Sequence, residues 1–469
     1  MTEHDTKIVA FLCTWCSYAG ADLAGTGRNQ YPPNVRVIRV PCSGRINPLY
    51  IIKALLEGAD GVMISGCHPG DCHYLVGNYY ARRRFTVLKK LLTTAGIDPD
   101  KIHFTWVSAS EGVRFAETIK EITEKVKNSV SNQCRSPMFC SQNDCDDNRQ
   151  KNNFNNHELF LSQEKELIEL CKKLLDDSIV NTIIGYKNND ETWFNIPYII
   201  RTSEEADKLV WNNKCIPALS GYLHERTGKT AIVAKPCDAR AVVNLIRENQ
   251  LSRDDVYIIG MSCDGMFYEG MADEKGYIVP GCANCQVHVP PVYDILITGS
   301  ETENVTVNKS LRSDNADDSG NSSNNSTNNE CTENRQYNDF SFERFKQEID
   351  KCILCYSCRQ ACYGCYCKTC FMERGEPDWQ TSSPDTGAKM LYHLGRVMHL
   401  AGRCVECGSC ENACASGIDV RYLIKDVTDF IKETYDYQTG MDFETDAAML
   451  SYKPDDPEIG FLGGDKCER

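Results

Sequence analysis

Two tandem cysteine strings near the end of the chain carry the clearest chemical signal in the sequence. Both have the spacing C-x-x-C-x-x-C-x-x-x-C, and their members are Cys352, Cys355, Cys358 and Cys362, then Cys404, Cys407, Cys410 and Cys414. Three cysteines two residues apart can wrap a tight loop around three corners of a cubane, and the fourth reaches a partner cluster. The strings therefore predict two 4Fe–4S clusters, each held by the first three cysteines of one string and the fourth of the other.

Zinc sites are the alternative interpretation of the two strings. Zinc knuckles use C-x-x-C pairs or Cys with His, and the repeated four-cysteine spacing disfavours them. Proline usually follows the fourth cysteine, but Tyr363 and Ala415 stand there, so the local geometry and the potential are in question while ligation is not. Three further thiols follow the first string: Cys365, Cys367 and Cys370. They belong to a further cluster, to a small zinc site or to the surroundings of the first cluster.

A second group of cysteines lies near the start of the chain, where apolar runs read as strands. It comprises Cys13, Cys16, Cys42, Cys67 and Cys72. The runs at 7–13, 35–41 and 61–67 each end at or just before one of these thiols. Because the carboxyl ends of parallel strands share one edge of a sheet, the five thiols should converge there. Thiolates alone suit an iron–sulfur cluster or zinc.

Histidines and arginines near these thiols have competing interpretations. His68 and His73 flank Cys67 and Cys72, either as Rieske-like ligands or as histidines outside the ligand set. The Arg82–Arg84 run has three alternative interpretations. It docks a partner, it balances the charge of a cluster, or it forms a solvated face.

The middle of the chain repeats the strand-end arrangement. Cys237 follows the run at 230–236, and Cys263 follows the run at 256–262. A C-x-x-C pair, Cys282 and Cys285, comes next. The four thiols predict a third 4Fe–4S cluster, with a four-cysteine zinc site as the alternative.

These sites must be positioned by folded pieces that two low-complexity stretches separate. The stretches are rich in Asn, Asp and Ser and bury too little apolar surface to offset the entropy of ordering. Alternating strands and helices predict α/β domains; further strands are expected at 103–109, 181–187 and 197–201. The expected order is an α/β domain with a parallel sheet at 6–128, a flexible linker at 129–157, a second α/β domain at 158–309, a low-complexity linker at 310–338, a two-cluster ferredoxin-type domain at 339–430 and an irregular tail at 431–469.

Composition narrows the compartment and the partners. The 469-residue chain has a net charge of −15 and 27 cysteines. The charge argues against nucleic acid or an anionic membrane surface as partner. No export leader is apparent, and no apolar run reaches the ~18 residues of a bilayer span, so we expect a cytoplasmic protein whose patterned cysteines bind metal. Thiols outside any pattern are interpreted as free: Cys134, Cys140, Cys145, Cys171, Cys215, Cys331 and Cys467.

Four stretches of the first piece carry a family resemblance: FLCTWCSYAGADLAG, YPPNVRVIRVPCSGR, GADGVMISGCHPGDCHYLVGNYYARRR and WVSASEGVRFAE. Over about residues 7–128 they closely resemble the delta (D) subunit of methyl-viologen-reducing, F420-non-reducing hydrogenase. The resemblance implies a 2Fe–2S cluster held by four of the five N-terminal cysteines. It also implies a relay role between a hydrogenase, or a formate dehydrogenase, and heterodisulfide reductase.

A second resemblance covers about residues 165–425. KPCDAR, CILCYSCRQACYGCYCKTC and RVMHLAGRCVECGSCENACASGIDV are similar to the beta subunits of deazaflavin-dependent hydrogenases and formate dehydrogenases. This family can bind FAD and exchange electrons with the deazaflavin coenzyme. The chain has no G-x-G-x-x-G fingerprint, so FAD as a cofactor rests on the resemblance alone.

The cysteine sites together predict an iron–sulfur electron-transfer subunit, because no nucleophile, base or substrate pocket is recognisable. It would relay electrons between a hydrogenase or formate dehydrogenase and a heterodisulfide-reductase-like complex in anaerobic metabolism such as methanogenesis. The alternatives are an FAD-containing subunit that oxidises or reduces the deazaflavin coenzyme and feeds the clusters, and a zinc-stapled interaction protein.

Overall fold

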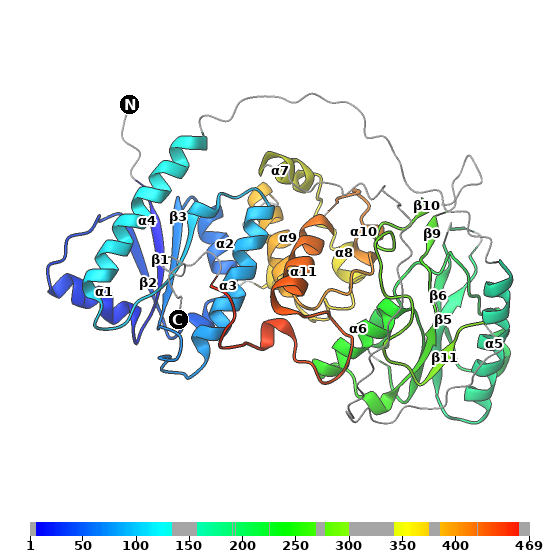
Figure 1. The fold of residues 1–469 in the computed structure, drawn as a ribbon. Helices are drawn as coiled ribbons and strands as arrows, with labels where there is room; N and C mark the ends of the chain where they lie inside the picture. The colour runs from blue at the N-terminus through cyan, green and yellow to red at the C-terminus, as the bar shows by residue number, and fades with distance from the viewer. Residues whose placement is uncertain are drawn as a thin grey trace, which may run out of the picture.

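Two α/β domains flank a helical module (Figure 1). The computed structural model describes residues 6–133, 157–189, 191–192, 194–224, 226–268, 277–299, 342–374, 385–419 and 421–458. None of the described helices combines the length and the hydropathy that a bilayer span requires.

The first domain is built on a four-stranded parallel sheet with the order β2-β1-β3-β4. Its strands are β1 (Ile8–Cys13), β2 (Val35–Val40), β3 (Gly61–Gly66) and β4 (Ile102–Trp106). In the register, Ile8 lies beside Val35 on one side and Gly61 on the other, so three strands end level with one another. The four strands predicted here are confirmed within three residues, as is the parallel sheet.

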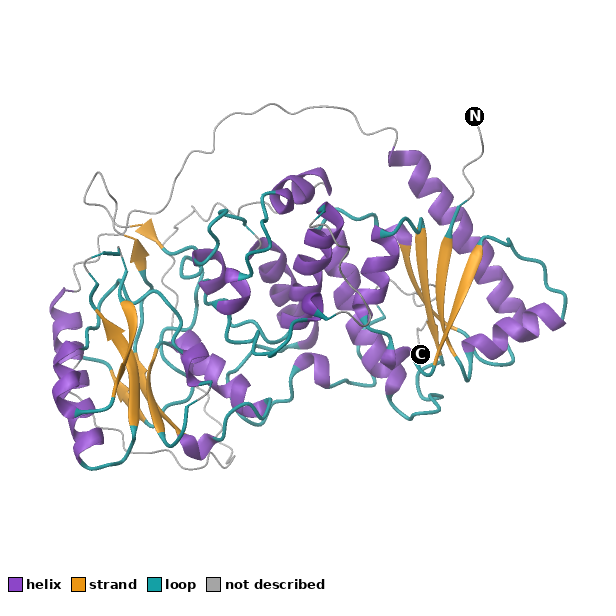
Figure 2. Cartoon of the chain, turned by 180° about the vertical axis from the view of Figure 1, so that it is seen from behind, coloured by secondary structure: helices purple, strands orange, loops and turns teal. Residues whose placement is uncertain are grey.

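Helices cover both faces of this sheet (Figure 2). They are α1 (Ser17–Thr26), α2 (Pro48–Leu56), α3 (Gly77–Thr94) and α4 (Gly112–Gln133). Alternate residues of β1 enter opposite cores: Leu12 packs with α4, while Phe11 belongs to the core that contains α2 and α3. Such two-sided burial is typical of parallel sheets. Asn47 starts α2 by accepting a hydrogen bond from the Leu49 N–H at 3.0 Å.

The second domain has a five-stranded sheet with the order β11-β8-β7-β5-β6. Its strands are β5 (Thr182–Lys187), β6 (Ile196–Ile200), β7 (Thr230–Ala234), β8 (Val256–Met261) and β11 (Ile295–Ile297). Only β6 runs antiparallel to its neighbour, because the link from β5 is too short for a crossover helix. The four predicted strands are confirmed, and the three-residue β11 was not predicted. The domain's helices are α5 (His157–Asp176) and α6 (Pro236–Arg247).

The helical module shares its hydrophobic core with the first domain. Its helices are α7 (Phe342–Asp350), α8 (Ser357–Gln360), α9 (Thr386–Leu400), α10 (Ser409–Asn412) and α11 (Arg421–Tyr435). One continuous cluster joins Leu49 and Phe85 of the first domain to Leu394 and Val427 of the module. At Gly395 the helices α9 and α2 are so close that an added Cβ would stand 2.5 Å from Leu49 Cδ2. The two pieces are therefore packed as one body.

The segment after α11 returns to the first domain (Figure 1). It is irregular, with one 3-10 turn, η8 (Ala448–Leu450), in its described part. Arg82 Nη2 donates to the carbonyl oxygens of Lys453 (2.8 Å) and Pro454 (2.9 Å), and Arg83 forms an ion pair with Asp456. Arg82 and Arg83 are both 4 % exposed, so the solvated-face interpretation is wrong for them. Residues 453–456 of the same chain contact both side chains.

The domain limits remain predictions, although the helices refine one of them. α4 continues to Gln133 and α5 begins at His157, so the predicted linker at 129–157 overlaps helix at both ends. Residues 134–156 and the whole predicted linker at 310–338 lie outside the described residues. The same holds for Cys134, Cys140, Cys145, Cys331 and Cys467.

Candidate iron–sulfur sites

The N-terminal thiols gather at the carboxyl edge of the first sheet. Cys13 ends β1 and Cys67 follows β3, and their Sγ atoms are 3.7 Å apart. Cys42 follows β2 and Cys72 precedes α3, and their Sγ atoms are 3.8 Å apart. Cys16, just before α1, lies against Cys67. The structure thus brings all five predicted residues together, four of them as two close pairs.

Burial distinguishes four thiols from the fifth, Cys16, although Cys16 also contacts Cys67. Two thiolates on one tetrahedral metal with bonds of ~2.3 Å stand ~3.8 Å apart, and both pairs have this separation. The paired thiols are buried, whereas Cys16 is only partly so. Burial raises the pKa of the Cys42 thiol to about 11, an environment in which a thiolate needs a bound cation. Each pair therefore has the separation expected of two thiolates on one tetrahedral metal ion.

Two glycines make room for these thiols. A Cβ on Gly77, the first residue of α3, would stand 2.5 Å from Cys42 Sγ and 3.3 Å from Cys72 Sγ. A Cβ on Gly44 would stand 2.4 Å from the Gly77 carbonyl oxygen. Any larger side chain would displace the loop that carries Cys42. No spacing signal marked these glycines in the sequence, because their role depends on two loops far apart in the chain.

The histidines beside the thiols have partners of their own. His68 Nε2 lies 2.8 Å from Glu111 Oε2, and the ring of His73 stacks on Trp15 with centroids 3.9 Å apart. Asn78 Nδ2 donates to the carbonyl oxygens of Cys67 (3.1 Å) and His68 (2.6 Å) and so holds this loop. These contacts favour the interpretation that both histidines stand outside the ligand set.

The two C-terminal strings fold into the same loop twice. In the first, Leu354 and Tyr356 have φ of 52° and 60°; at the equivalent places in the second, Glu406 and Gly408 have φ of 60° and 74°. Non-glycine residues rarely adopt positive φ. Three of them do so here at matching positions, so both loops curl around an interior in the same way.

Backbone amides point at sulfur in both loops. The Leu354 N–H donates to Cys352 Sγ and the Glu406 N–H to Cys404 Sγ, each at 3.3 Å. The Ile418 N–H donates to Cys414 Sγ at 3.4 Å. Amide donors to sulfur stabilise a thiolate and tune the potential of a cluster bound through it. The loops therefore suit iron–sulfur ligation.

A buried arginine lies between the two strings. Arg396, on α9, is 4 % exposed, and its Nη2 donates to the Cys358 carbonyl oxygen at 3.0 Å. Its Nε has no hydrogen-bond partner among the described residues. The charges of Cys410 and Cys362, one from each string, favour its protonated form and raise the pKa of Arg396 against the effect of burial. The sequence pattern gave no reason to select this residue.

Tyr363 stands where proline usually follows the fourth cysteine of the first string, and it contacts the second domain there. Its ring is buried in a small cluster with Ala241 and Leu245 of α6, and its hydroxyl accepts a hydrogen bond from Asn244 Nδ2 at 2.9 Å. The hydroxyl also donates to the Arg403 carbonyl oxygen. The position that proline usually occupies is used here to attach the second domain.

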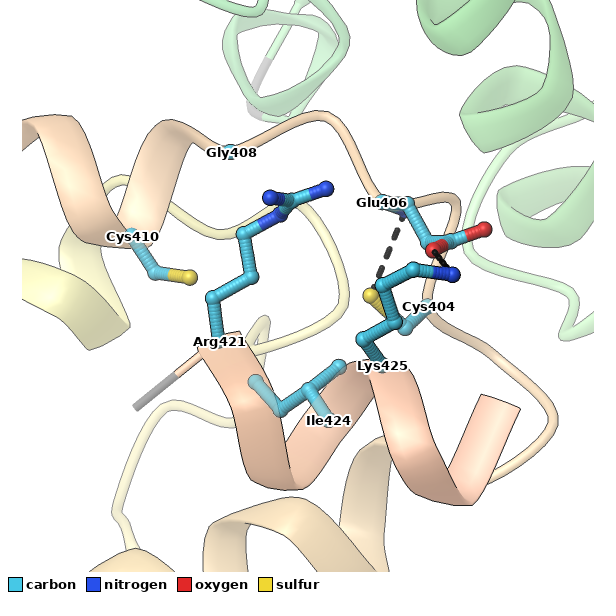
Figure 3. Close-up of a pocket in the computed structure, with 7 residues that line it drawn as sticks. All are labelled: Cys404, Glu406, Gly408, Cys410, Arg421, Ile424 and Lys425. Carbon is cyan, nitrogen blue, oxygen red and sulfur yellow. Dashed lines mark hydrogen bonds and ion pairs between the residues drawn. The ribbon is translucent and has the colours of Figure 1, made fainter. Parts of the chain in front are cut away.

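Cations from α11 face the second loop. Figure 3 shows Arg421, Ile424 and Lys425 on α11 directed toward the loop that carries Cys404 and Cys410. Lys425 Nζ is 3.8 Å from Glu406 Oε1 in that loop. Positive charge beside several thiolates lowers the cost of burying them.

The middle thiols meet the second string. Cys237, at the start of α6, is close enough to Cys263 and Cys407 for their charges to influence it. Burial raises the pKa of Cys263, and the thiolate charges of Cys282 and Cys285 help to raise it further, so these thiols also lie near it. A Cβ on Gly281 would lie 3.2 Å from the Glu406 carbonyl oxygen. The predicted middle site is therefore adjacent to the second C-terminal loop.

The three extra thiols do not share one environment. The Cys365 N–H donates to the Cys362 carbonyl oxygen at 3.1 Å, and its thiol contacts that of Cys362. Cys367 is exposed, and Cys370 is half-buried before the turn η7 (Phe371–Glu373). Among the described residues, no three His, Cys, Asp or Glu side chains are arranged for a single metal ion. Ligation at every site therefore remains a prediction.

Comparisons with known proteins concern the first domain. The family model described as "Methyl-viologen-reducing hydrogenase, delta subunit" matches residues 8–129. The iron–sulfur D subunit of F420-non-reducing hydrogenase from Archaeoglobus profundus is 52% identical over 125 residues, which cover 27% of this chain and 91% of that protein. The iron–sulfur D subunit of the vhc F420-non-reducing hydrogenase from Methanococcus voltae is 54% identical over 128 residues, or 27% of this chain and 89% of that protein.

One relative is a much longer protein. The A subunit of ferredoxin:CoB-CoM heterodisulfide reductase from Methanosarcina mazei is 50% identical over 129 residues. The match covers 27% of this chain but only 16% of that protein. The delta-type domain thus occurs both as a separate subunit and within a larger reductase subunit.

Proposed function

Through residues 8–129 the chain belongs to the methyl-viologen-reducing hydrogenase delta-subunit family, and from this premise we propose that it is an iron–sulfur electron-transfer subunit that relays electrons between two oxidoreductases. Relatives of its first domain are named as iron–sulfur subunits of a hydrogenase and as part of a heterodisulfide reductase. The partners proposed for this chain are a hydrogenase or formate dehydrogenase on one side and a heterodisulfide-reductase-like complex on the other, in the cytoplasm.

The observation that carries the proposal is the pairing of four buried thiols at one sheet edge. Cys13 and Cys67 would bind one iron of a 2Fe–2S cluster, and Cys42 and Cys72 the other. When bound, such a cluster accepts and releases single electrons. The chain's own contribution is to keep the four thiols dry and at the spacing that a tetrahedral iron requires.

The helical module would hold two 4Fe–4S clusters. Its two loops share one backbone shape and direct amides at Cys352 and Cys404. Arg396 would balance the negative charge of both clusters, since it lies among thiols of both strings. The module's central position (Figure 1) suits a site that receives electrons from one α/β domain and passes them toward the other.

A third 4Fe–4S cluster is proposed on Cys237, Cys263, Cys282 and Cys285. Its support is the contact between this region and the second loop, where Gly281 meets Glu406. Adjacent sites shorten each electron-transfer step, so the middle domain would extend the relay on the side away from the first domain.

Metal and sulfide analysis tests the proposal. Protein purified without oxygen should contain about 14 irons and about 14 acid-labile sulfides per chain, from one 2Fe–2S and three 4Fe–4S clusters. Zinc without sulfide would contradict the relay. Flavin released by acid would instead support the FAD-containing subunit that exchanges electrons with the deazaflavin coenzyme. Anaerobic affinity purification of the native complex would identify the donor and the acceptor.

A further inference from the structure

A cleft lies where the first domain, the second domain, the module and the terminal segment meet. Its volume is about 510 Å³, within the ~300–1,000 Å³ typical of small-molecule sites. Arg84 of α3, Arg247 at the end of α6, Arg403 after α9 and Leu450 of η8 all line it. Because four separate segments build it, the cleft exists only in the assembled chain.

Two of the three arginines form no ion pair within the described part of the chain. Arg403 is neutralised by Glu248, with Nη2 and Oε2 2.5 Å apart. Arg84 Nη1 instead donates to the Gly44 carbonyl oxygen at 2.9 Å, and Arg247 Nη1 to the Tyr437 hydroxyl at 3.3 Å. These two acceptors are neutral, although Arg247 is also close enough to Asp442 to help lower the pKa of that carboxyl. Burial lowers the pKa of Arg84. An anion bound beside the two guanidinium groups would offset the cost of burying their positive charge. Such a cationic cleft stands out in a chain whose net charge is −15.

The rest of the lining is largely apolar. Leu49, Met398 and Met449 contribute side chains, and the Arg403 guanidinium covers the Tyr366 ring at 5.2 Å from its centroid. The described residues that line the cleft include no cysteine, so the predicted cluster sites leave it unassigned. An apolar wall beside the Arg84 and Arg247 cations suits a ligand with an anionic head and an apolar or ring-shaped body.

We propose that this cleft binds a small organic phosphate, with the phosphate on Arg84 and Arg247 and the body against the apolar wall. Guanidinium groups bind phosphate oxygens through two parallel N–H donors. The site is separate from the proposed electron relay, and the failure of one would not imply the failure of the other.

Calorimetry on the full-length, cluster-loaded protein tests the site, with ADP and inorganic pyrophosphate as probes. We expect saturable binding of both, tighter for ADP because only ADP has a body to place against the apolar wall. Arg84→Gln and Arg247→Gln should each weaken binding about tenfold or more, the loss of a charged hydrogen bond. Arg201→Gln, at an exposed arginine elsewhere in the second domain, should leave affinity unchanged.

Two matched substitutions at the rim of the cleft control for effects of misfolding. Leu450 is 68% exposed, so its replacement should not disturb the core. Leu450→Glu places a negative charge at the cleft and should weaken both probes, whereas the isosteric Leu450→Gln should not. The proposal is overturned if neither probe binds saturably, or if binding is unaffected by Arg84→Gln, Arg247→Gln and Leu450→Glu.

Discussion

Arg83 and Asp456 form a buried bidentate ion pair although 373 residues separate them. Nε lies 2.9 Å from Oδ2 and Nη2 lies 2.7 Å from Oδ1. Arg83 Nη1 also donates to the Ala448 carbonyl oxygen at 2.9 Å, and its guanidinium lies 4.4 Å from the centre of the Tyr435 ring. The pair fastens the terminal segment to the first domain.

Replacing Asp456 by Asn should destabilise the protein by about 3–5 kcal/mol, because Arg83 would stay buried without its partner. The urea midpoint of the cluster-loaded protein measures the effect. Glu57→Gln, which removes an exposed pair with Lys53, is the matched control and should cost at most about 0.5 kcal/mol. Equal midpoints for Asp456→Asn and the unaltered protein would contradict the structural role of the pair.

Cys16→Ala and Cys42→Ala should have opposite outcomes. Cys42→Ala removes one member of a close thiol pair and should abolish the 2Fe–2S signal in electron paramagnetic resonance, with a loss of about two irons per chain. Cys16→Ala should keep both signal and iron, because this thiol is outside the two pairs. If Cys16→Ala loses the signal while Cys13→Ala keeps it, Cys16 is a ligand in place of Cys13.

Arg396→Gln should shift the 4Fe–4S reduction potentials to lower values. A positive charge near a cluster stabilises its more negative, reduced form, and Arg396 supplies that charge among thiols of both strings. Arg396→Lys keeps the charge and should shift the potentials less. Redox titration followed by electron paramagnetic resonance measures both variants, with unchanged iron content as the control for folding. Potentials that stay constant or rise in Arg396→Gln would refute this role.

Tyr363→Phe should weaken the attachment of the second domain. The change removes the hydrogen bonds of the hydroxyl with Asn244 Nδ2 and with the Arg403 carbonyl oxygen, which keep their direct hydrogen bond of 3.3 Å. The expected cost is about 1 kcal/mol. Urea unfolding measures it, and Tyr222→Phe, at a tyrosine that is 43% exposed, should be neutral. A neutral Tyr363→Phe would mean that the ring alone makes the attachment.

Cys171 and Cys215 should resist alkylation in the folded protein. Both are fully buried, and burial raises their pKa to about 12 and about 11. Labelling should stay slow from pH 7 to 9, because both thiols remain mostly protonated and their burial excludes the reagent. Mass spectrometry after iodoacetamide treatment should find them modified only in urea. Rapid labelling of the native protein would show that these cores open.

Local patterns were enough to place most strands and to group the cysteines. A buried parallel strand reads as a short apolar run, and a turn or a cysteine marks its end, so β1, β3, β7 and β8 were predictable. The convergence of Cys13, Cys42 and Cys67 followed from the rule that parallel strands end at one edge. The three-residue β11 was missed because so short a segment has no periodicity to detect.

The sequence by itself determined the α/β class, the family of the first domain and which thiols recur in ligand-like spacing. Only the tertiary structure decided which thiols pair, that Arg82 and Arg83 are buried beneath the terminal segment, that Tyr363 attaches α6, and that Arg396 lies between the two strings. Spacing along the chain encodes contacts within a loop or a strand end. Contacts between residues tens to hundreds of positions apart depend on how sheets, loops and helices pack against one another, and no short-range pattern records that packing.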